Sequence, residues 1–236
     1  MPYPQLTWST RKQLTRLGSA LRGGVRPELE AVYQRIFDRD IERLGIGNDF
    51  YPVSSAANYS LMYLVSRLLQ NFKFRQIVEL GAGQTTLLID AFKKKTIFDG
   101  SATTIEHDKN WKDFIQERVG HELKLVPLSS SHYVGGYDLT SLEISSKIDF
   151  LLIDGPPASG TGYLSRHSAL PFVEQLNENG FVVVIDDAER RGESELAKRI
   201  ADILHSKHID FRVGDVLAAK RQTVFASGVF ESAAFF

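Results

Sequence analysis

From residue 73 onward, short apolar runs of strand length alternate with amphipathic segments of helix length. The apolar runs are 76–80, 102–107, 123–128, 149–154 and 181–186, and the helical patterns cover 85–95, 109–119, 167–180 and 193–205. This alternation is typical of βαβ units, which build a parallel sheet with helices on both faces. Residues 182–185 are continuously apolar, which favours a central strand buried on both sides.

The two ends of the chain depart from this alternation. Apolar residues spaced three or four apart predict a helix over 27–44, and a second helix is expected over 56–69. The segments 210–215 and 223–227 have no helix-length spacer between them, so we expect an antiparallel pair that closes the sheet. The predicted organisation is an N-terminal arm and helical cap over 1–50, followed by a doubly wound α/β domain over 51–236.

Composition narrows the class of protein. The 236 residues are 43% hydrophobic and 24% charged, as expected of a globular domain that buries a sizeable core. The formal net charge of −1 gives no argument for nucleic acid or an acidic membrane as a partner. No apolar run reaches the roughly 20 residues of a membrane span. With no secretion-signal pattern and no cysteine, a cytoplasmic protein is expected, and any metal would need oxygen or histidine ligands.

A glycine pair lies between the first predicted strand of the sheet and the helix that follows it. In VELGAGQTT, Gly81 and Gly83 would let the backbone approach a ligand, and the helix would present free N–H groups to it. Thr86 stands where the dinucleotide pattern G-x-G-x-x-G has its third glycine. A tight turn without any ligand is the alternative.

An acid closes the second predicted strand, 23 residues after Gly83. At this place Glu106 can accept hydrogen bonds from both hydroxyls of a ribose. A second acid, Glu79, lies two residues before the first glycine, where it would repel a pyrophosphate and suit a positively charged group. These residues predict a nucleoside-type ligand, and Glu79 favours a cationic one.

With E-x-G-x-G followed by an acid after the second strand, the chain resembles the class I S-adenosylmethionine (SAM)-dependent methyltransferases over roughly residues 51–228. The resemblance implies a seven-stranded, mostly parallel sheet with its last strand inserted antiparallel, and the first strand beside the fourth. It implies SAM as the cofactor. The cofactor-binding residues that it implies are Glu79, Gly81, Ala82, Gly83, Thr85, Thr86, Glu106, His107, Ser129, Ser130 and Asp154.

Three aspartates follow two strands that are predicted neighbours. Asp154 ends the fourth strand, and Asp186 and Asp187 end the fifth. Carboxyl ends of parallel strands share one edge of a sheet, so we expect these carboxylates to converge. Without a cation they would repel one another, and the pKa of at least one would rise. A hard divalent ion such as Mg²⁺, which prefers oxygen ligands, would remove the repulsion.

The aspartates match the places of the metal ligands in metal-dependent small-molecule O-methyltransferases, which the chain resembles. The resemblance implies that Asp154, Asp186 and Asp187 hold Mg²⁺, which would bind two acceptor oxygens and lower the pKa of one hydroxyl. Asp154 and His167 are candidates for the base that takes the proton. Capping of the next helix and a salt-bridged turn with Arg190 are the alternatives for the aspartate pair.

The expected protein is a SAM-dependent methyltransferase that acts on a hydroxyl of a small molecule, such as a sugar, a polyol or a phenol. A metal-independent O- or N-methyltransferase, an NAD-binding oxidoreductase and a non-catalytic binding protein are the alternatives. The net charge argues against a nucleic-acid acceptor. The apolar C-terminal segment 229–236 indicates packing against another surface, which leaves a homodimer open.

Overall fold

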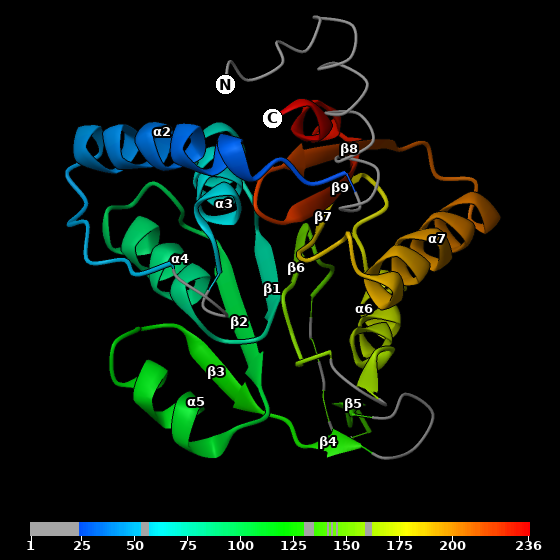
Figure 1. Cartoon of the computed structure of the whole chain (residues 1–236). Helices are drawn as coiled ribbons and strands as arrows, with labels where there is room; N and C mark the ends of the chain where they lie inside the picture. Colours follow the sequence, from blue (N-terminus) through cyan, green and yellow to red (C-terminus); the bar gives the residue numbers. More distant parts are fainter. Residues whose placement is uncertain are drawn as a thin grey trace, which may run out of the picture.

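A seven-stranded sheet runs through the centre of the chain, with helices on both faces (Figure 1). The structure, a computed structural model, describes residues 24–52, 57–129, 135–140, 142, 144, 146–158 and 162–236; Ser130 and most of the basic arm lie outside them. The strand order is β3-β2-β1-β6-β7-β9-β8. The bounds are β1 Gln76–Leu80, β2 Ser101–Glu106, β3 Glu122–Leu125, β6 Phe150–Ile153, β7 Gly180–Ile185, β8 Arg212–Leu217 and β9 Arg221–Gly228.

Strand directions confirm the predicted topology. The pairs β1–β2, β2–β3, β1–β6 and β6–β7 are parallel, whereas β9 runs antiparallel to both β7 and β8. The first strand therefore lies beside the fourth strand of the sheet, and the last strand of the chain is inserted antiparallel. A separate short pair, β4 Leu128–Ser129 and β5 Gly136–Tyr137, lies beyond the end of β3.

Helices cover the two faces of the sheet unequally. The helices α2 Glu30–Arg43, α3 Tyr59–Asn71 and α4 Gln84–Lys94 lie on one face, and α6 Leu170–Val173 and α7 Arg191–Ser206 lie on the other (Figure 1). The alternation of strand side chains divides the core accordingly, because Ile77 packs on the first face and Val78 on the second. Helix α5, Lys109–Gln116, packs beside β3. Among the described residues, no helix has both the length and the apolarity needed to cross a membrane.

The helix predicted over 167–180 is much shorter than expected. A 3₁₀ turn, η3 Ser165–Ala169, leads into the single turn of α6. The chain then pairs Leu176 with Ile148, through hydrogen bonds from Ile148 N to Gln175 O and from Asn177 N to Ile148 O. A tertiary backbone pairing thus ends the helix before its apolar pattern does.

The N-terminal helices belong to the same core as the sheet. The predicted helix over 27–44 is confirmed as the turn η1 Pro27–Leu29 followed by α2. From α2, Phe37 and Ile41 are fully buried in the cluster that also contains α3, α4 and the first face of the sheet. The domain boundary after residue 50 stays a prediction.

The apolar C-terminal segment packs against the chain itself. The ring of Phe230 stacks on Phe74, with centroids 4.9 Å apart, and the turn η4 Glu231–Phe235 buries Ala233 and Ala234 beside β8 and β9. Phe230, Ala233 and Ala234 are therefore buried within one chain, whereas Val229 and Phe235 stay exposed.

Candidate active site

The loops after β1, β2, β6 and β7 surround one cavity at the carboxyl edge of the sheet. Its volume is about 620 Å³, within the roughly 300–1,000 Å³ of small-molecule sites. The glycine half of its wall comes from the β1 and β2 loops with α5 and β5, and contains Gly81, Ala82, Gly83, Gln84, Glu106, His107, Asp108, Trp111 and Tyr137. The aspartate half contains Asp154, Gly155, Pro156, Pro157, Ala158, Arg166, Asp187, Arg190 and Lys220, and Ala57 completes the lining.

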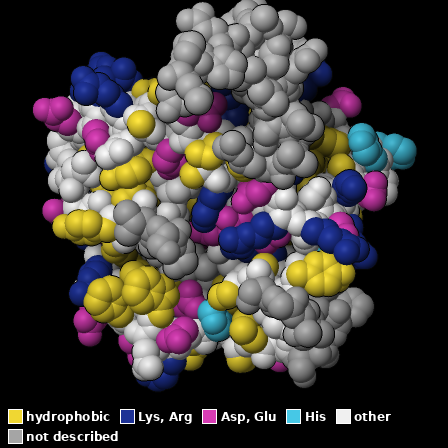
Figure 2. Space-filling view, viewed as in Figure 1, with side chains coloured by type: hydrophobic (Ala, Val, Ile, Leu, Met, Phe, Trp, Pro, Cys, Tyr) yellow, Lys and Arg dark blue, Asp and Glu magenta, His cyan; other side chains and the backbone are white. Residues whose placement is uncertain are grey.

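Charge is distributed unevenly between the two halves. Acidic and basic side chains gather near the middle of the face shown in Figure 2. In the lining, the glycine half has two acids, Glu106 and Asp108, and no lysine or arginine. All three cations of the described lining, Arg166, Arg190 and Lys220, belong to the aspartate half. The glycine half therefore suits a cationic ligand.

Two glycines hold the β1 and β6 loops in direct backbone contact. Gly81 has φ +94°, a left-handed conformation that favours glycine. A Cβ atom on Gly155 would lie 2.7 Å from the Cα of Gly81. Because the clash would be with backbone, a rotation of a side chain could not relieve it. The strand order brings these loops together, and the two glycines let their backbones touch.

Gly83 presents bare backbone to the cavity at the start of α4. A Cβ atom built there meets no atom within 4 Å, so packing within the protein does not require a glycine at this position. The Gly83 N–H donates to Thr86 Oγ1 at 2.8 Å, which ties the loop to the first turn of the helix. The open space above Gly83 is available to a ligand.

Glu106 connects the glycine loop to the end of β2. Its Oε2 accepts from Ala82 N at 3.0 Å, and its Oε1 accepts from His107 N at 2.6 Å and Asp108 N at 2.9 Å. The carboxylate is buried by the protein yet lines the cavity. Oε2 accepts from Ala82 N and has a lone pair left, so it can accept a further hydrogen bond from a ligand.

Aromatic rings border the glycine half. Trp111 donates from its indole N–H to Ala82 O at 2.7 Å and stacks on Phe114, with centroids 5.3 Å apart. Across the cavity wall, the hydroxyl of Tyr137 donates to Ile105 O at 3.2 Å, and burial raises the Tyr137 pKa well above its usual value. These side chains give the half a flat, partly apolar wall of the kind that receives planar ligands.

Glu79 does not reach the cavity, contrary to the expectation that it contacts the cofactor. It alternates with Val78 and Leu80, so it lies on the α4 face of β1 and is fully buried. Its carboxylate accepts hydrogen bonds from Thr85 (2.5 Å), Thr86 (2.7 Å) and Thr104 (2.7 Å). Thr85 and Thr86 therefore anchor α4 to the sheet and are likewise absent from the lining. Burial raises the pKa of Glu79 to about 7.

The three aspartates converge as predicted, with carboxylate oxygens within 4.8 Å of one another. Lys220 lies between two of them: its Nζ is 3.1 Å from Asp186 Oδ2 and 3.1 Å from Asp187 Oδ1. Asp187 has φ +57°, and Arg190 also reaches its Oδ2 at 2.9 Å. The ion pair with Arg190, one of the alternatives drawn from the sequence, is therefore present beside a buried pair with Lys220.

Arg166 is the second buried cation of this cluster. Its guanidinium donates to Pro156 O, Asp186 O and Asp154 O, and its Nη2 lies 3.3 Å from Asp154 Oδ1 and 3.1 Å from Asp187 Oδ2. One planar side chain thus joins the loops after β6 and β7, which suits the fixed donor fork of arginine.

The neighbouring charges separate the pKa values of the aspartates. Burial, and next the charge of Asp186, raises the pKa of Asp154 well above its usual value. Burial would also raise the pKa of Asp186, but Lys220 and Arg166 bring it below its usual value. Burial opposes the charge of Lys220, yet the aspartates raise its pKa, so the ammonium stays protonated. Asp154 is the carboxyl group of the cavity best suited to hold and release a proton.

The trio does not offer a free set of ligands to a divalent ion. Mg²⁺ requires near-octahedral oxygens at about 2.0–2.1 Å. Lys220 instead lies between Asp186 and Asp187, and Arg166 between Asp154 and Asp187. An ion bound by all three carboxylates would have to displace these cations, so the predicted magnesium site does not fit this arrangement.

His167 and the predicted serines are not part of the lining. His167 is buried under the start of α7, with Nε2 3.0 Å from Gly192 O, and burial lowers its pKa. It is therefore not placed to act on a ligand in this cavity. Ser129 lies in β4 and does not line the cavity, and Ser130 lies outside the described residues.

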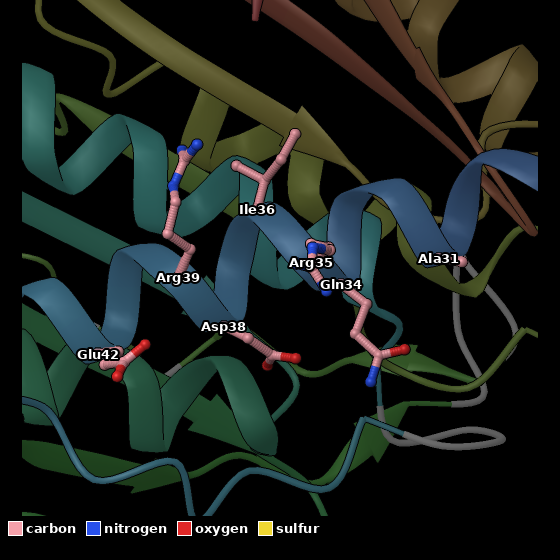
Figure 3. Close-up of a pocket in the computed structure, with 7 residues that line it drawn as sticks. All are labelled: Ala31, Gln34, Arg35, Ile36, Asp38, Arg39 and Glu42. Carbon is pink, nitrogen blue, oxygen red and sulfur yellow. The ribbon is translucent and has the colours of Figure 1, made fainter.

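A second hollow, along the helix α2, carries no comparable chemistry. All of its lining residues belong to one helix, α2, and they are Ala31, Gln34, Arg35, Ile36, Asp38, Arg39 and Glu42 (Figure 3). Their side chains leave the helix in different directions instead of converging on a point. The cavity at the carboxyl edge of the sheet is therefore the candidate active site.

Comparisons with known proteins leave the family of the chain open. No protein-family model matches the sequence, and a search of curated protein sequences gives no significant match. Among solved structures, an O-methyltransferase from Bacillus cereus in complex with SAH is similar at 13% identity, 81% coverage of this chain, 90% coverage of that chain and a TM-score of 0.47.

Two further structures are similar to the same degree. An SAH-bound methyltransferase from Podospora anserina has 13% identity, covers 95% of this chain and 98% of its own, and gives a TM-score of 0.45. A methyltransferase from Pyrococcus furiosus has 14% identity, coverages of 86% and 98%, and a TM-score of 0.48. These likenesses are too distant to assign an activity or a substrate, so the assignment depends on the site itself.

Proposed function

We propose that the chain is a SAM-dependent methyltransferase that transfers a methyl group to a hydroxyl of a small molecule. The observation that carries this proposal is that one cavity at the carboxyl edge is lined by residues from three different strand ends, Gly83, Glu106 and Asp154. A ligand that spans the cavity would meet bare backbone and an acid at one end and, at the other, the carboxyl of Asp154, whose raised pKa makes it a stronger base once it is ionised.

The residues of the glycine half fit the nucleoside part of SAM. Bare backbone at Gly83 leaves room for the ligand, Glu106 has a lone pair for a ribose hydroxyl, and Trp111 and Tyr137 border a flat space. The acids of this half attract a sulfonium. Thr86 stands where the dinucleotide pattern G-x-G-x-x-G has its third glycine, which counts against a nicotinamide dinucleotide.

The residues of the aspartate half fit an acceptor hydroxyl. When bound, SAM supplies a methyl group whose bond to sulfur breaks as a bond to the acceptor oxygen forms, which releases S-adenosylhomocysteine (SAH), the methyl ether and a proton. In its ionised form Asp154 accepts that proton, while Lys220 holds Asp186 and Asp187, and Arg166 holds Asp154 and Asp187. Pro156 and Pro157 add apolar surface to the lining of this half.

A small hydroxylated acceptor, such as a sugar, a polyol or a phenol, agrees with the mixed lining of this half. Carboxylates accept hydrogen bonds from hydroxyl groups, and Lys220 and Arg190 donate to their oxygens. The net charge of −1 gives the molecule no general attraction for the phosphates of a nucleic acid.

Calorimetric titration with SAH tests the proposal. We expect wild-type protein to bind SAH and not NAD⁺, and Glu106→Ala to bind SAH roughly 10- to 100-fold more weakly, because a hydrogen bond to a charged group is lost. The control is Glu122→Ala, which removes an exposed glutamate at the start of β3, outside the lining. Binding of NAD⁺ in preference to SAH, or equal affinities for both variants, would reject the assignment.

A further inference from the structure

The cluster of strand-end aspartates contains its own cation. Lys220 Nζ donates to Asp186 Oδ2 at 3.1 Å and forms an ion pair with Asp187 Oδ1 at 3.1 Å. The two carboxylate side chains are 0% and 2% exposed, and the lysine side chain is 17% exposed at the cavity wall. A buried carboxylate pair needs a compensating charge, and here the chain supplies it.

The backbone around Lys220 is fixed from several sides. Residues 218–220 form the turn between β8 and β9, and Ala218 O accepts from Arg26 N at 2.7 Å. Ala219 N donates to Glu30 Oε2 at 3.2 Å. After the turn, Arg221 N donates to Glu189 Oε2 at 2.8 Å. The ammonium is thus held by backbone contacts to distant segments as well as by its ion pairs.

Gln222 completes the coordination of Asp186. Its Nε2 donates to Asp186 Oδ1 at 2.7 Å, and its Oε1 accepts from Ser60 Oγ at 2.8 Å. Both oxygens of Asp186 therefore have partners within the protein. Only a rearrangement of Gln222 or Lys220 would free this carboxylate for a metal.

Building on the proposed methyltransferase function, we propose that Lys220 is the resident cation of the acceptor end and occupies the position between Asp186 and Asp187 that a divalent ion would need. The site therefore works without a metal. An ammonium carries three N–H donors, so at least one remains for an acceptor oxygen at the cavity wall. Lys220 is thus a positioning residue for the carboxylates and a donor to the acceptor.

The arrangement differs from a metal site in a way that can be measured. Mg²⁺ requires near-octahedral oxygens at about 2.0–2.1 Å, whereas the ammonium accepts looser geometry at ordinary hydrogen-bond distances. Removal of the ammonium leaves a carboxylate trio with one vacated position. That trio should then accept an oxygen-seeking ion that the wild-type protein excludes.

Titration with Mn²⁺, followed by electron paramagnetic resonance of the free ion, tests the proposal on the full-length wild type and its variants. We expect no specific binding to the wild type, and binding to Lys220→Ala at least about ten-fold tighter than to the wild type. The control is Lys207→Ala, which removes a lysine paired with Glu174 on the surface and should behave as the wild type. Adding Asp186→Asn to Lys220→Ala should abolish the gained binding.

Stability gives a second reading that does not depend on activity. Lys220→Ala should lower the melting temperature by roughly 10 °C, because two buried carboxylates lose their partner. Saturating Mn²⁺ should recover part of this loss in Lys220→Ala and have no effect on the wild type. If the variant folds only when refolded with Mn²⁺ and not with Na⁺, that outcome supports the proposal equally.

Two outcomes would overturn the proposal. One is tight Mn²⁺ binding to the wild type that Asp186→Asn abolishes. The other is the absence of Mn²⁺ binding or rescue in Lys220→Ala, which would mean that Lys220 does not occupy the position of an ion. SAH binding, measured on the same proteins, is a separate readout. A wild-type protein that does not bind SAH would reject the methyltransferase assignment, and the Mn²⁺ titration would still decide whether Lys220 occupies the position of an ion.

Discussion

Glu79 is a carboxyl group held entirely inside the protein by hydroxyl groups. Three threonines donate to it, and no lysine or arginine forms an ion pair with it among the described residues. Hydroxyl donors stabilise the carboxylate only in part, so burial dominates and raises the pKa to about 7 from the ordinary 4.5. The free energy of unfolding therefore depends, through Glu79, on pH below and near neutrality.

The raised pKa of Glu79 predicts a loss of stability as pH rises from 4.5 to 7. In this window the folded protein holds a proton that the unfolded protein has released, so the free energy of unfolding falls with rising pH, by at most about 3 kcal/mol from this residue. Urea unfolding of the wild type and of Glu79→Gln at pH 5 and pH 8 measures the effect. We expect the wild type to lose more stability than the variant; equal losses would contradict the buried titration.

Strand parity could have placed Glu79 from the sequence. Ile77 and Glu79 alternate with Val78 and Leu80, so an acid two residues before Gly81 lies on one face of the strand and not at its end. Gly83, Glu106 and Asp154 line the cavity because of their positions at strand ends: Gly83 lies in the loop after β1, Glu106 ends β2 and Asp154 directly follows β6. Thr85 and Thr86 donate to Glu79, so they lie on the same face of the sheet and not in the cavity.

Lys220 was not predicted as a site residue, and the contacts of Arg166 with the aspartates were not predicted, because the partners are far away in the sequence. Arg166 meets Asp187 across 21 positions, and Lys220 meets Asp186 across 34. A signal for Lys220 was nevertheless present: a strand inserted antiparallel beside β7 must begin at the edge where β7 ends, so the base just before it faces the aspartates. For Arg166, which follows a loop, no comparable pattern exists.

At the scale of elements, the site depends on how closely the β1 and β6 loops approach. Gly155 has no room for a side chain against the backbone of Gly81, whereas Gly83 has open space. Substitution of Gly155 therefore tests the packing of the loops, and substitution of Gly83 tests the space for a ligand.

Alanine at these two glycines should have opposite effects. Gly155→Ala should lower the free energy of unfolding by about 1–3 kcal/mol, because the loops must separate. Gly83→Ala should lose no more than about 1 kcal/mol of stability, since its φ of −179° is open to any residue, yet weaken SAH binding because the methyl group enters the cavity. Urea unfolding and calorimetry check both, and a Gly83→Ala variant with unchanged SAH affinity would contradict the placement of the ligand.

The helix over 167–180 shows where element prediction fails. Its apolar spacing is helical, but the backbone of 175–177 pairs with Ile148 and ends α6 after one turn. Propensity and pattern describe the segment alone, and the competing partner is a residue almost 30 positions earlier. The remaining long helices and strands were predicted to within a few residues, because each carries its own apolar period.

At the scale of the whole molecule, segments from both ends of the chain meet at the active site. The N-terminal residues Arg26 and Glu30 bond to the turn that presents Lys220 from the last strand pair. Asn58 and Ser60, at the start of α3, reach the same cluster through Gln222. The N-terminal helices are therefore part of the support of the site, which a resemblance confined to residues 51–228 could not reveal.

A crystal structure of the protein with SAH is the most direct test of the proposed site. We expect the ribose hydroxyls on Glu106, the nucleoside over Gly83, and the sulfur directed toward Asp154 and Lys220, with Glu79 out of contact beneath α4. SAH bound elsewhere on the molecule, or bound in this cavity with its sulfur directed away from Asp154, would contradict it.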